Sequence, residues 1–124
     1  MSAVTAKVFD LVWSRDQGCC VRCGAALVGA RGLSWSVHHR RPRSMGGSKL
    51  PWVDKPGNLV LVCGSGVTSC HGWIESHRAF ARASGFLVSA NGQRKPAEVP
   101  IHHSIHGLVI LDDLGGWTNN DHPF

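Results

Sequence analysis

Two cysteine pairs that lie far apart in the chain constrain its fold more than any other sequence feature. Cys20 and Cys23 form a CxxCG turn, and Cys63 and Cys70 flank a glycine-containing loop. Four thiolates at these spacings can surround a tetrahedral Zn²⁺, and they would then tie the N-terminal segment to the middle of the chain. Because four thiolates leave no open coordination position, we expect one structural Zn²⁺ here.

The fifth cysteine, Cys19, is expected to stay free, because adjacent cysteines can hardly bind one ion together. Charged residues run through the apolar pattern of the N-terminus, which favours an amphipathic helix over a signal peptide. We therefore expect a cytoplasmic protein, in which thiols favour metal binding over disulfides. Buried thiols without a metal are the alternative; a redox CxxC is disfavoured because no thioredoxin-like βαβ pattern accompanies it.

The apolar periodicity predicts a small α+β protein. With 124 residues, the chain has the length of one domain, and no stretch approaches the roughly 20 apolar residues of a membrane span. The patterns predict a helix over 3–14 that stops at Gly18, strands over 33–39 and 58–63, a polar loop over 42–58 and a helix over 69–85. The middle of the chain is therefore a ββα unit, and short strands follow it.

A basic cluster follows the first predicted strand. His38 and His39 lead into Arg40, Arg41 and Arg43 within "SVHHRRPRSMGG", and Lys49 comes later in the same loop. The chain carries a formal net charge of +5 and a pI near 9.3, which favours an anionic partner such as nucleic acid. We expect the three arginines and Lys49 to contact DNA phosphates, although any one of them could instead be a solvated loop charge.

The stretches "VHHRRPRSMGG", "GNLVLVC" and "SCHGWIESH" together resemble the HNH endonucleases, whose motif reads His, Asn, His in chain order. The resemblance implies a ββα-metal (HNH, His-Me finger) fold for a single domain over 1–124. Its core would cover about 18–85, and 86–124 would be a short C-terminal β extension similar to that of small phage-encoded members.

The resemblance also implies a metal-dependent DNA endonuclease. His38 and His71 would hold a catalytic divalent ion (Mg²⁺, Mn²⁺, Ni²⁺ or Zn²⁺), and His39 would be the general base that activates water. Adjacent strand residues point to opposite faces, so two neighbouring histidines can take two different roles. Asn58 would either bind the ion or hydrogen-bond across the loop, and both roles remain open.

Glu75 lies one helical turn after His71, at a position where many HNH proteins have a second histidine. It could bind the ion, bind it through water, or only pair with an arginine. The resemblance further implies 5′-phosphate and 3′-hydroxyl products, location in the host cytoplasm if the gene is phage-encoded, and a link to terminase and genome packaging. It does not specify an oligomeric state.

Two other functions compete with the nuclease. A zinc-stabilised DNA-binding module without catalysis is favoured by Glu75, whereas a zinc adaptor that binds no nucleic acid is disfavoured by the arginines. Of the remaining histidines, His77 is expected to pack with Phe80 in the core or at its rim. His102, His103 and His106 are expected to form a DNA-facing edge or plain surface, with metal binding as the alternative.

Overall fold

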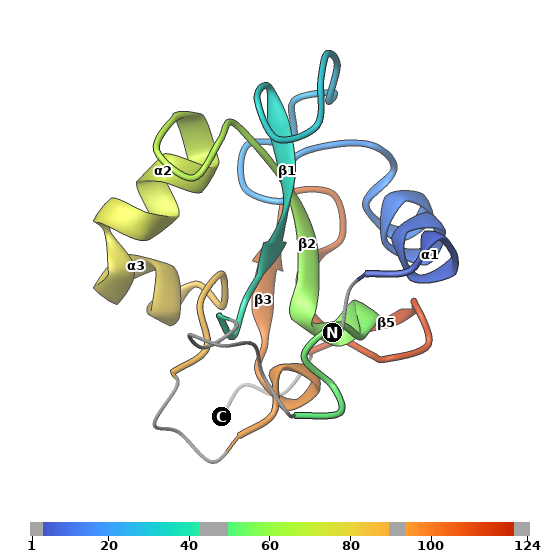
Figure 1. Cartoon of the computed structure of the whole chain (residues 1–124). Helices are drawn as coiled ribbons and strands as arrows, with labels where there is room; N and C mark the ends of the chain where they lie inside the picture. Colours follow the sequence, from blue (N-terminus) through green and yellow to red (C-terminus); the bar gives the residue numbers. More distant parts are fainter. Residues whose placement is uncertain (1–3, 43–49, 90–93, 121–124) are drawn as a thin grey trace.

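An antiparallel pair of strands forms the centre of the fold (Figure 1). β1 (Trp35–His39) pairs with β2 (Leu59–Cys63), with Trp35 opposite Cys63 and His39 opposite Leu59. Figure 1 shows α1 (Ala6–Asp16) on one side of this pair and α2 (Ser69–Ser76) on the other. Both helices contact β2. The four residues from Leu59 to Val62 are therefore completely buried, which explains why this strand is apolar on both faces.

The computed structural model describes residues 4–42, 50–89 and 94–120. In this part of the chain, the remaining elements are a third helix, two short 3₁₀ helices and a three-stranded antiparallel sheet in the order β3-β4-β5: α3 (Arg78–Ala83), η1 (Pro56–Asn58), η2 (Pro96–Glu98), β3 (Ile101–His103), β4 (Gly107–Leu111) and β5 (Trp117–Asn119). The expected mixed α+β composition is confirmed. Among the described residues, none of the helices has the length and apolarity needed to cross a bilayer.

The first helix ends at Asp16, two residues beyond the predicted range of 3–14 and just before the predicted stop at Gly18. The Thr5 side chain accepts a hydrogen bond from the Val8 amide, so the helix begins at Ala6 and not at residue 3. After Asp16 the backbone enters the left-handed region at Gln17 and Gly18, with φ of 55° and 63°. A Cβ at Gly18 would lie 2.7 Å from the Trp13 ring, so glycine is required on steric grounds as well.

The helix expected over 69–85 is interrupted at His77, which separates α2 from α3. Ser76 donates its hydroxyl hydrogen back to the Gly72 carbonyl at 2.9 Å, a contact that competes with helix continuation. The expected packing of His77 with Phe80 is wrong. His77 instead stacks on Trp73 at 4.9 Å between ring centroids, and Phe80 is 68% exposed.

Candidate functional site

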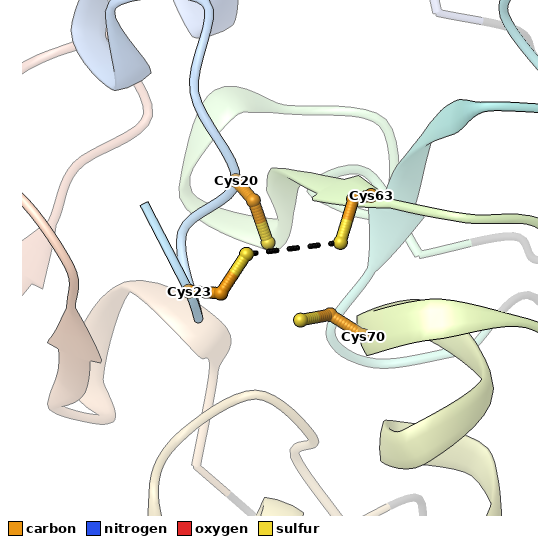
Figure 2. Close-up of side chains that lie close together, drawn as sticks. All are labelled: Cys20, Cys23, Cys63 and Cys70. Carbon is orange, nitrogen blue, oxygen red and sulfur yellow. Dashed lines mark hydrogen bonds between the residues drawn. The ribbon is translucent and has the colours of Figure 1, made fainter. Parts of the chain in front are cut away.

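Four cysteine sulfurs converge where the N-terminal turn, β2 and α2 meet (Figure 2). The Sγ atoms of Cys20, Cys23, Cys63 and Cys70 all lie within 4.8 Å of one another, and those of Cys23 and Cys63 are 3.8 Å apart. A tetrahedral zinc with Zn–S bonds of about 2.3 Å places its sulfurs about 3.8 Å apart. The cluster can hold a metal ion and is consistent with a structural zinc. Cys19 is not part of it and donates to the Gln17 carbonyl.

One cation, Arg22, lies against this cluster. Arg22 donates to the Cys70 sulfur at 3.3 Å, and its guanidinium lies 3.7 Å from the centre of the Trp73 ring. Burial, together with the neighbouring thiols, raises the pKa of the Cys70 thiol, against the smaller opposing effect of Arg22. A bound cation would reverse this shift, because it favours the thiolate.

A second cluster joins the first strand to the following helix. One ligand atom from each of His38, His71 and Glu75 lies within 4.8 Å of the others, and the two imidazole centroids are 5.0 Å apart. His38 comes from β1, whereas His71 and Glu75 are one turn apart on α2. The structure thus brings together three of the residues that the sequence assigned to the catalytic ion.

Hydrogen bonds fix which nitrogen of each imidazole carries the proton. His38 Nε2 lies 2.8 Å from the Phe86 carbonyl oxygen, which can only accept, so Nε2 donates. The Ser36 hydroxyl donates to the Gly64 carbonyl and therefore accepts from His71 Nδ1, at 2.7 Å. His38 Nδ1 and His71 Nε2 consequently keep their lone pairs, as metal-binding imidazoles require.

Electrostatics favour the neutral form of both rings. Burial, reinforced by the nearby charges of His71, His39 and Arg40, lowers the pKa of His38 to about 3. Burial also lowers the pKa of His71, although Glu75 opposes this effect. Two neutral imidazoles and one carboxylate form a ligand set of the kind found in hydrolytic zinc sites, with a coordination position left for water or substrate.

Glu75 takes part in two interactions. Besides its place in the cluster, its Oε2 accepts a hydrogen bond from Arg78 at 2.7 Å. A carboxylate has two oxygens, so pairing with Arg78 is compatible with binding an ion.

His39, the expected general base, lies apart from this cluster and is half-buried. Its Nε2 is 2.8 Å from Asp54 Oδ1, and its Nδ1 has no hydrogen bond within the described parts of the chain. The alternation along β1 therefore separates His38 and His39 as predicted.

Asn58 is 1% exposed and uses its side-chain amide within the protein. Its Oδ1 accepts from the Arg41 amide at 2.7 Å, and its Nδ2 donates to the Arg41 and Val53 carbonyls. The sequence left two roles open for Asn58, metal binding and hydrogen bonding across the loop, and the structure shows the hydrogen bonds across the loop. Its assignment as a metal ligand is therefore corrected, because the buried side chain is fixed at both its oxygen and its nitrogen by the backbone of the loop.

Arg40 is not a DNA contact, and this prediction is wrong. Its side chain is completely buried and donates to the carbonyls of four residues: Gly57, Gly85, Pro96 and Val99. Burial, with a smaller contribution from Arg15, lowers the pKa of this guanidinium to about 9. Arg41 is half-buried and lies over Trp52, whereas Arg43 and Lys49 lie outside the described residues.

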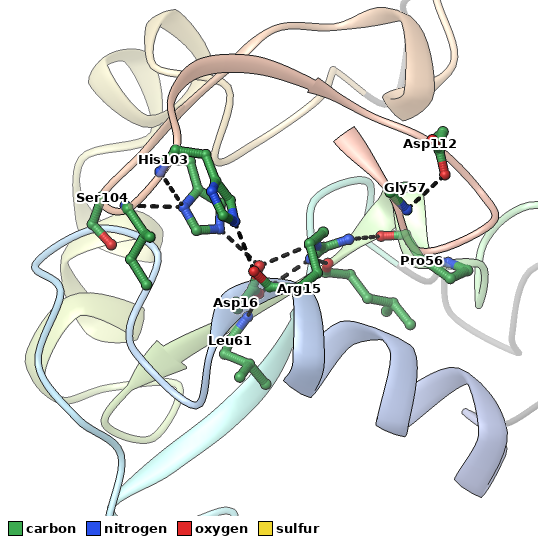
Figure 3. Close-up of polar contacts among 12 residues, drawn as sticks. Arg15, Asp16, Pro56, Gly57, Leu61, His103, Ser104 and Asp112 are labelled. Carbon is green, nitrogen blue, oxygen red and sulfur yellow. Dashed lines mark hydrogen bonds and ion pairs between the residues drawn. The ribbon is translucent and has the colours of Figure 1, made fainter. Parts of the chain in front are cut away.

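The C-terminal histidines are not a uniform surface edge, so that expectation is wrong for His103 (Figure 3). His103 is 3% exposed and lies 2.8 Å from Asp16, whose carboxylate also accepts from Arg15 and from the Leu61 amide. Burial alone would raise the pKa of Asp16, but the hydrogen bond from His103 and the charge of Arg15 outweigh it, so the pKa is lowered. His106 bonds to the Arg15 carbonyl, and only His102 of the three is exposed.

Sequence reasoning missed the residues that orient the site. Ser36 and His38 are two positions apart in a strand and so share one face, a signal that could have placed Ser36 beside His71. Asp54 and the Phe86 carbonyl carry no such signal, because each reaches the site from a loop.

Comparison of the chain with protein-family models, with curated proteins and with solved structures finds no match.

Proposed function

We propose that this chain is a metal-dependent DNA endonuclease of the HNH type, with a ββα-metal active site and one structural Zn²⁺ in the four-cysteine cluster. One observation carries the proposal: His38, His71 and Glu75 converge, and each imidazole has one nitrogen bonded to the protein and one lone pair available. The succession of β1, β2 and α2, with the cysteine cluster beside it, supports this assignment.

The residues divide the chemistry of phosphodiester hydrolysis among them. His38, His71 and Glu75 would hold a divalent ion, which would act as a Lewis acid on the phosphate and stabilise the leaving 3′ oxygen. His39 Nδ1 takes a proton from the attacking water while the water oxygen bonds to phosphorus. The bond between phosphorus and the 3′ oxygen breaks, and that oxygen is protonated by solvent.

The positive charge of the chain supports DNA as the substrate. The net charge of +5 favours a polyanion, and Arg41 lies two residues after the proposed base. Arg41 would contact a phosphate without reading the sequence, so its contribution to affinity should fall with salt.

A zinc-stabilised DNA-binding module without catalysis is the alternative function. The sequence favoured it because Glu75 replaces a histidine, but the Glu75 carboxylate lies beside both imidazoles and would provide a third ligand. A module that only binds DNA also has no need for two imidazoles with fixed tautomers.

Incubation of plasmid DNA with the protein and Mg²⁺, Mn²⁺, Ni²⁺ or Zn²⁺ tests the proposal. His39→Ala should lose a factor of roughly 10²–10⁴ in rate and still bind metal. His38→Ala should bind metal more weakly and regain part of its activity at high metal concentration. Asp10→Asn, which changes an exposed residue of α1 outside the site, is the control and should cut at the wild-type rate. Wild-type protein that binds DNA but cuts with none of the four ions would instead support the DNA-binding module.

A further inference from the structure

Asp54 is the one carboxylate that the described structure places against the proposed general base. Its Oδ1 lies 2.8 Å from His39 Nε2, and the two side chains are 12% and 20% exposed. We infer that Asp54 is a positioning residue that holds His39 in one orientation and one tautomer. This inference rests on the proposed nuclease function.

The chemistry of the contact selects the tautomer. An ionised carboxylate can only accept hydrogen bonds, so His39 Nε2 must carry the proton that faces it. The lone pair is then on Nδ1, the nitrogen that must take the proton from water. In serine proteases, a buried carboxylate also orients a catalytic imidazole, but there it holds Nδ1–H and leaves Nε2 as the base.

A second set of contacts holds Asp54 in place. The Asn58 amide donates to the carbonyl of Val53, the residue immediately before Asp54, at 2.8 Å. The same side chain forms two hydrogen bonds with the backbone of Arg41, two residues after His39. Asn58 thus clamps the loop segment that carries Asp54 to the end of the strand that carries His39, which gives this buried asparagine an indirect role in positioning the base.

Electrostatics argue against a direct role of Asp54 in DNA binding. A carboxylate close to a bound phosphate repels it, so a residue selected for DNA affinity at this place would not be acidic. Removal of the Asp54 charge should therefore leave DNA affinity unchanged or slightly higher, while catalysis falls.

A double-mutant cycle tests the inference through activity. Asp54→Ala should lower kcat about 10- to 10³-fold and leave KM for plasmid DNA within about 2-fold. The double variant His39→Ala with Asp54→Ala should be no slower than His39→Ala alone, because a positioning residue has no effect once its target is gone. Asp54→Asn keeps the size of the side chain and replaces Asp54→Ala if that variant folds poorly. Asp10→Asn, on the exposed part of α1, is the charge-matched control.

Nitrogen-15 NMR of the purified protein, without added divalent ion and at about pH 8, tests the same inference without activity. Wild type should show His39 protonated on Nε2, and Asp54→Ala should show a mixture of both tautomers. The inference would be overturned if wild type carried the His39 proton on Nδ1. It would also be overturned if the double variant were slower than His39→Ala by the same factor by which Asp54→Ala is slower than wild type. If no ion supports cleavage, the nuclease proposal fails, while the NMR result still decides whether Asp54 sets the tautomer.

Discussion

Two histidine pairs with similar distances between their rings have different chemistry in this protein. The imidazole centroids of His38 and His71 are 5.0 Å apart, and those of His103 and His106 are 4.5 Å apart. His38 and His71 each use one nitrogen in a hydrogen bond. His103 uses both, because Nδ1 accepts from the amides of Ile105 and His106 while Nε2 donates to Asp16.

The difference teaches that unused lone pairs, and not the number of histidines, identify a candidate metal site. The sequence "PIHHSIHG" contains more histidine than the sequence around His71, yet its buried member is fully occupied by hydrogen bonds. The His103 pair should therefore contribute to stability, and the His38 pair to metal binding. Four predictions, from the largest expected effect to the smallest, test this division.

The largest effect should come from the cysteine cluster, since the first turn of α2 carries both Cys70 and His71. Cys23→Ser should lose the structural zinc and most of its folded population, because metal binding and folding are linked. The His38 pair would then lose its geometry as well. Zinc analysis and circular dichroism measure both effects, and Cys19→Ser is the matched control. A Cys23→Ser protein that stays folded with a full complement of zinc contradicts the assignment.

Asp16→Ala should be the next most harmful change. It leaves Arg15 and His103 buried without their anion, which should lower the free energy of unfolding by about 3–5 kcal/mol. Urea denaturation measures this loss, and Asp10→Asn should change it little. If the folded Asp16→Ala protein bound catalytic metal more weakly than wild type, the two histidine regions would not be independent.

Two serines offer a matched pair of smaller changes. Ser36→Ala removes the acceptor of His71 Nδ1 and should weaken binding of the catalytic ion by about 10- to 100-fold. Ser104→Ala removes a hydroxyl that donates to the Cys20 carbonyl in the other region. It should lower stability by about 1 kcal/mol without affecting the catalytic ion. Isothermal titration with Ni²⁺ or Zn²⁺ measures the metal affinity of both variants. If Ser36→Ala and Ser104→Ala bound the ion equally well, Ser36 would have no role in the site.

The smallest effect should follow from one protonation step. The pKa of Asp16 is lower in the folded protein than its ordinary value, so its contribution to stability is fully present above about pH 4. It is lost as the pH falls through the folded-state pKa. Urea titrations between about pH 5 and 2 should therefore show a steeper loss of stability in wild type than in Asp16→Asn. Parallel curves would mean that the Asp16 pKa is not shifted by folding.

The sequence predicted the parts of the fold that depend on local patterns. The apolar run over 58–63 predicted the strand that became β2, and Gly18 predicted the stop that follows α1. The spacing of the cysteines predicted that four of the five would meet. The break at His77 was missed because a hydrogen bond from Ser76 to the backbone leaves no trace in the apolar periodicity.

Charge alone was a poor guide to the position of the arginines. Arg40 and Arg41 are neighbours in one basic run, yet Arg40 is buried and Arg41 is half-exposed. The carbonyls that accept from Arg40 come from segments as distant as Val99, so its burial depends on contacts that are remote in sequence.

The sequence by itself determined which residue types are available for metal binding and in what order they occur. Tertiary structure decided which of them keep a lone pair. That decision depends on the Phe86 carbonyl, the Ser36 hydroxyl and the Asp54 carboxylate, which approach His38, His71 and His39 from other segments of the chain. Local sequence determines strand alternation and helix periodicity, but hydrogen-bond partners are set by the packing of distant segments, and those partners define the tautomer of each histidine.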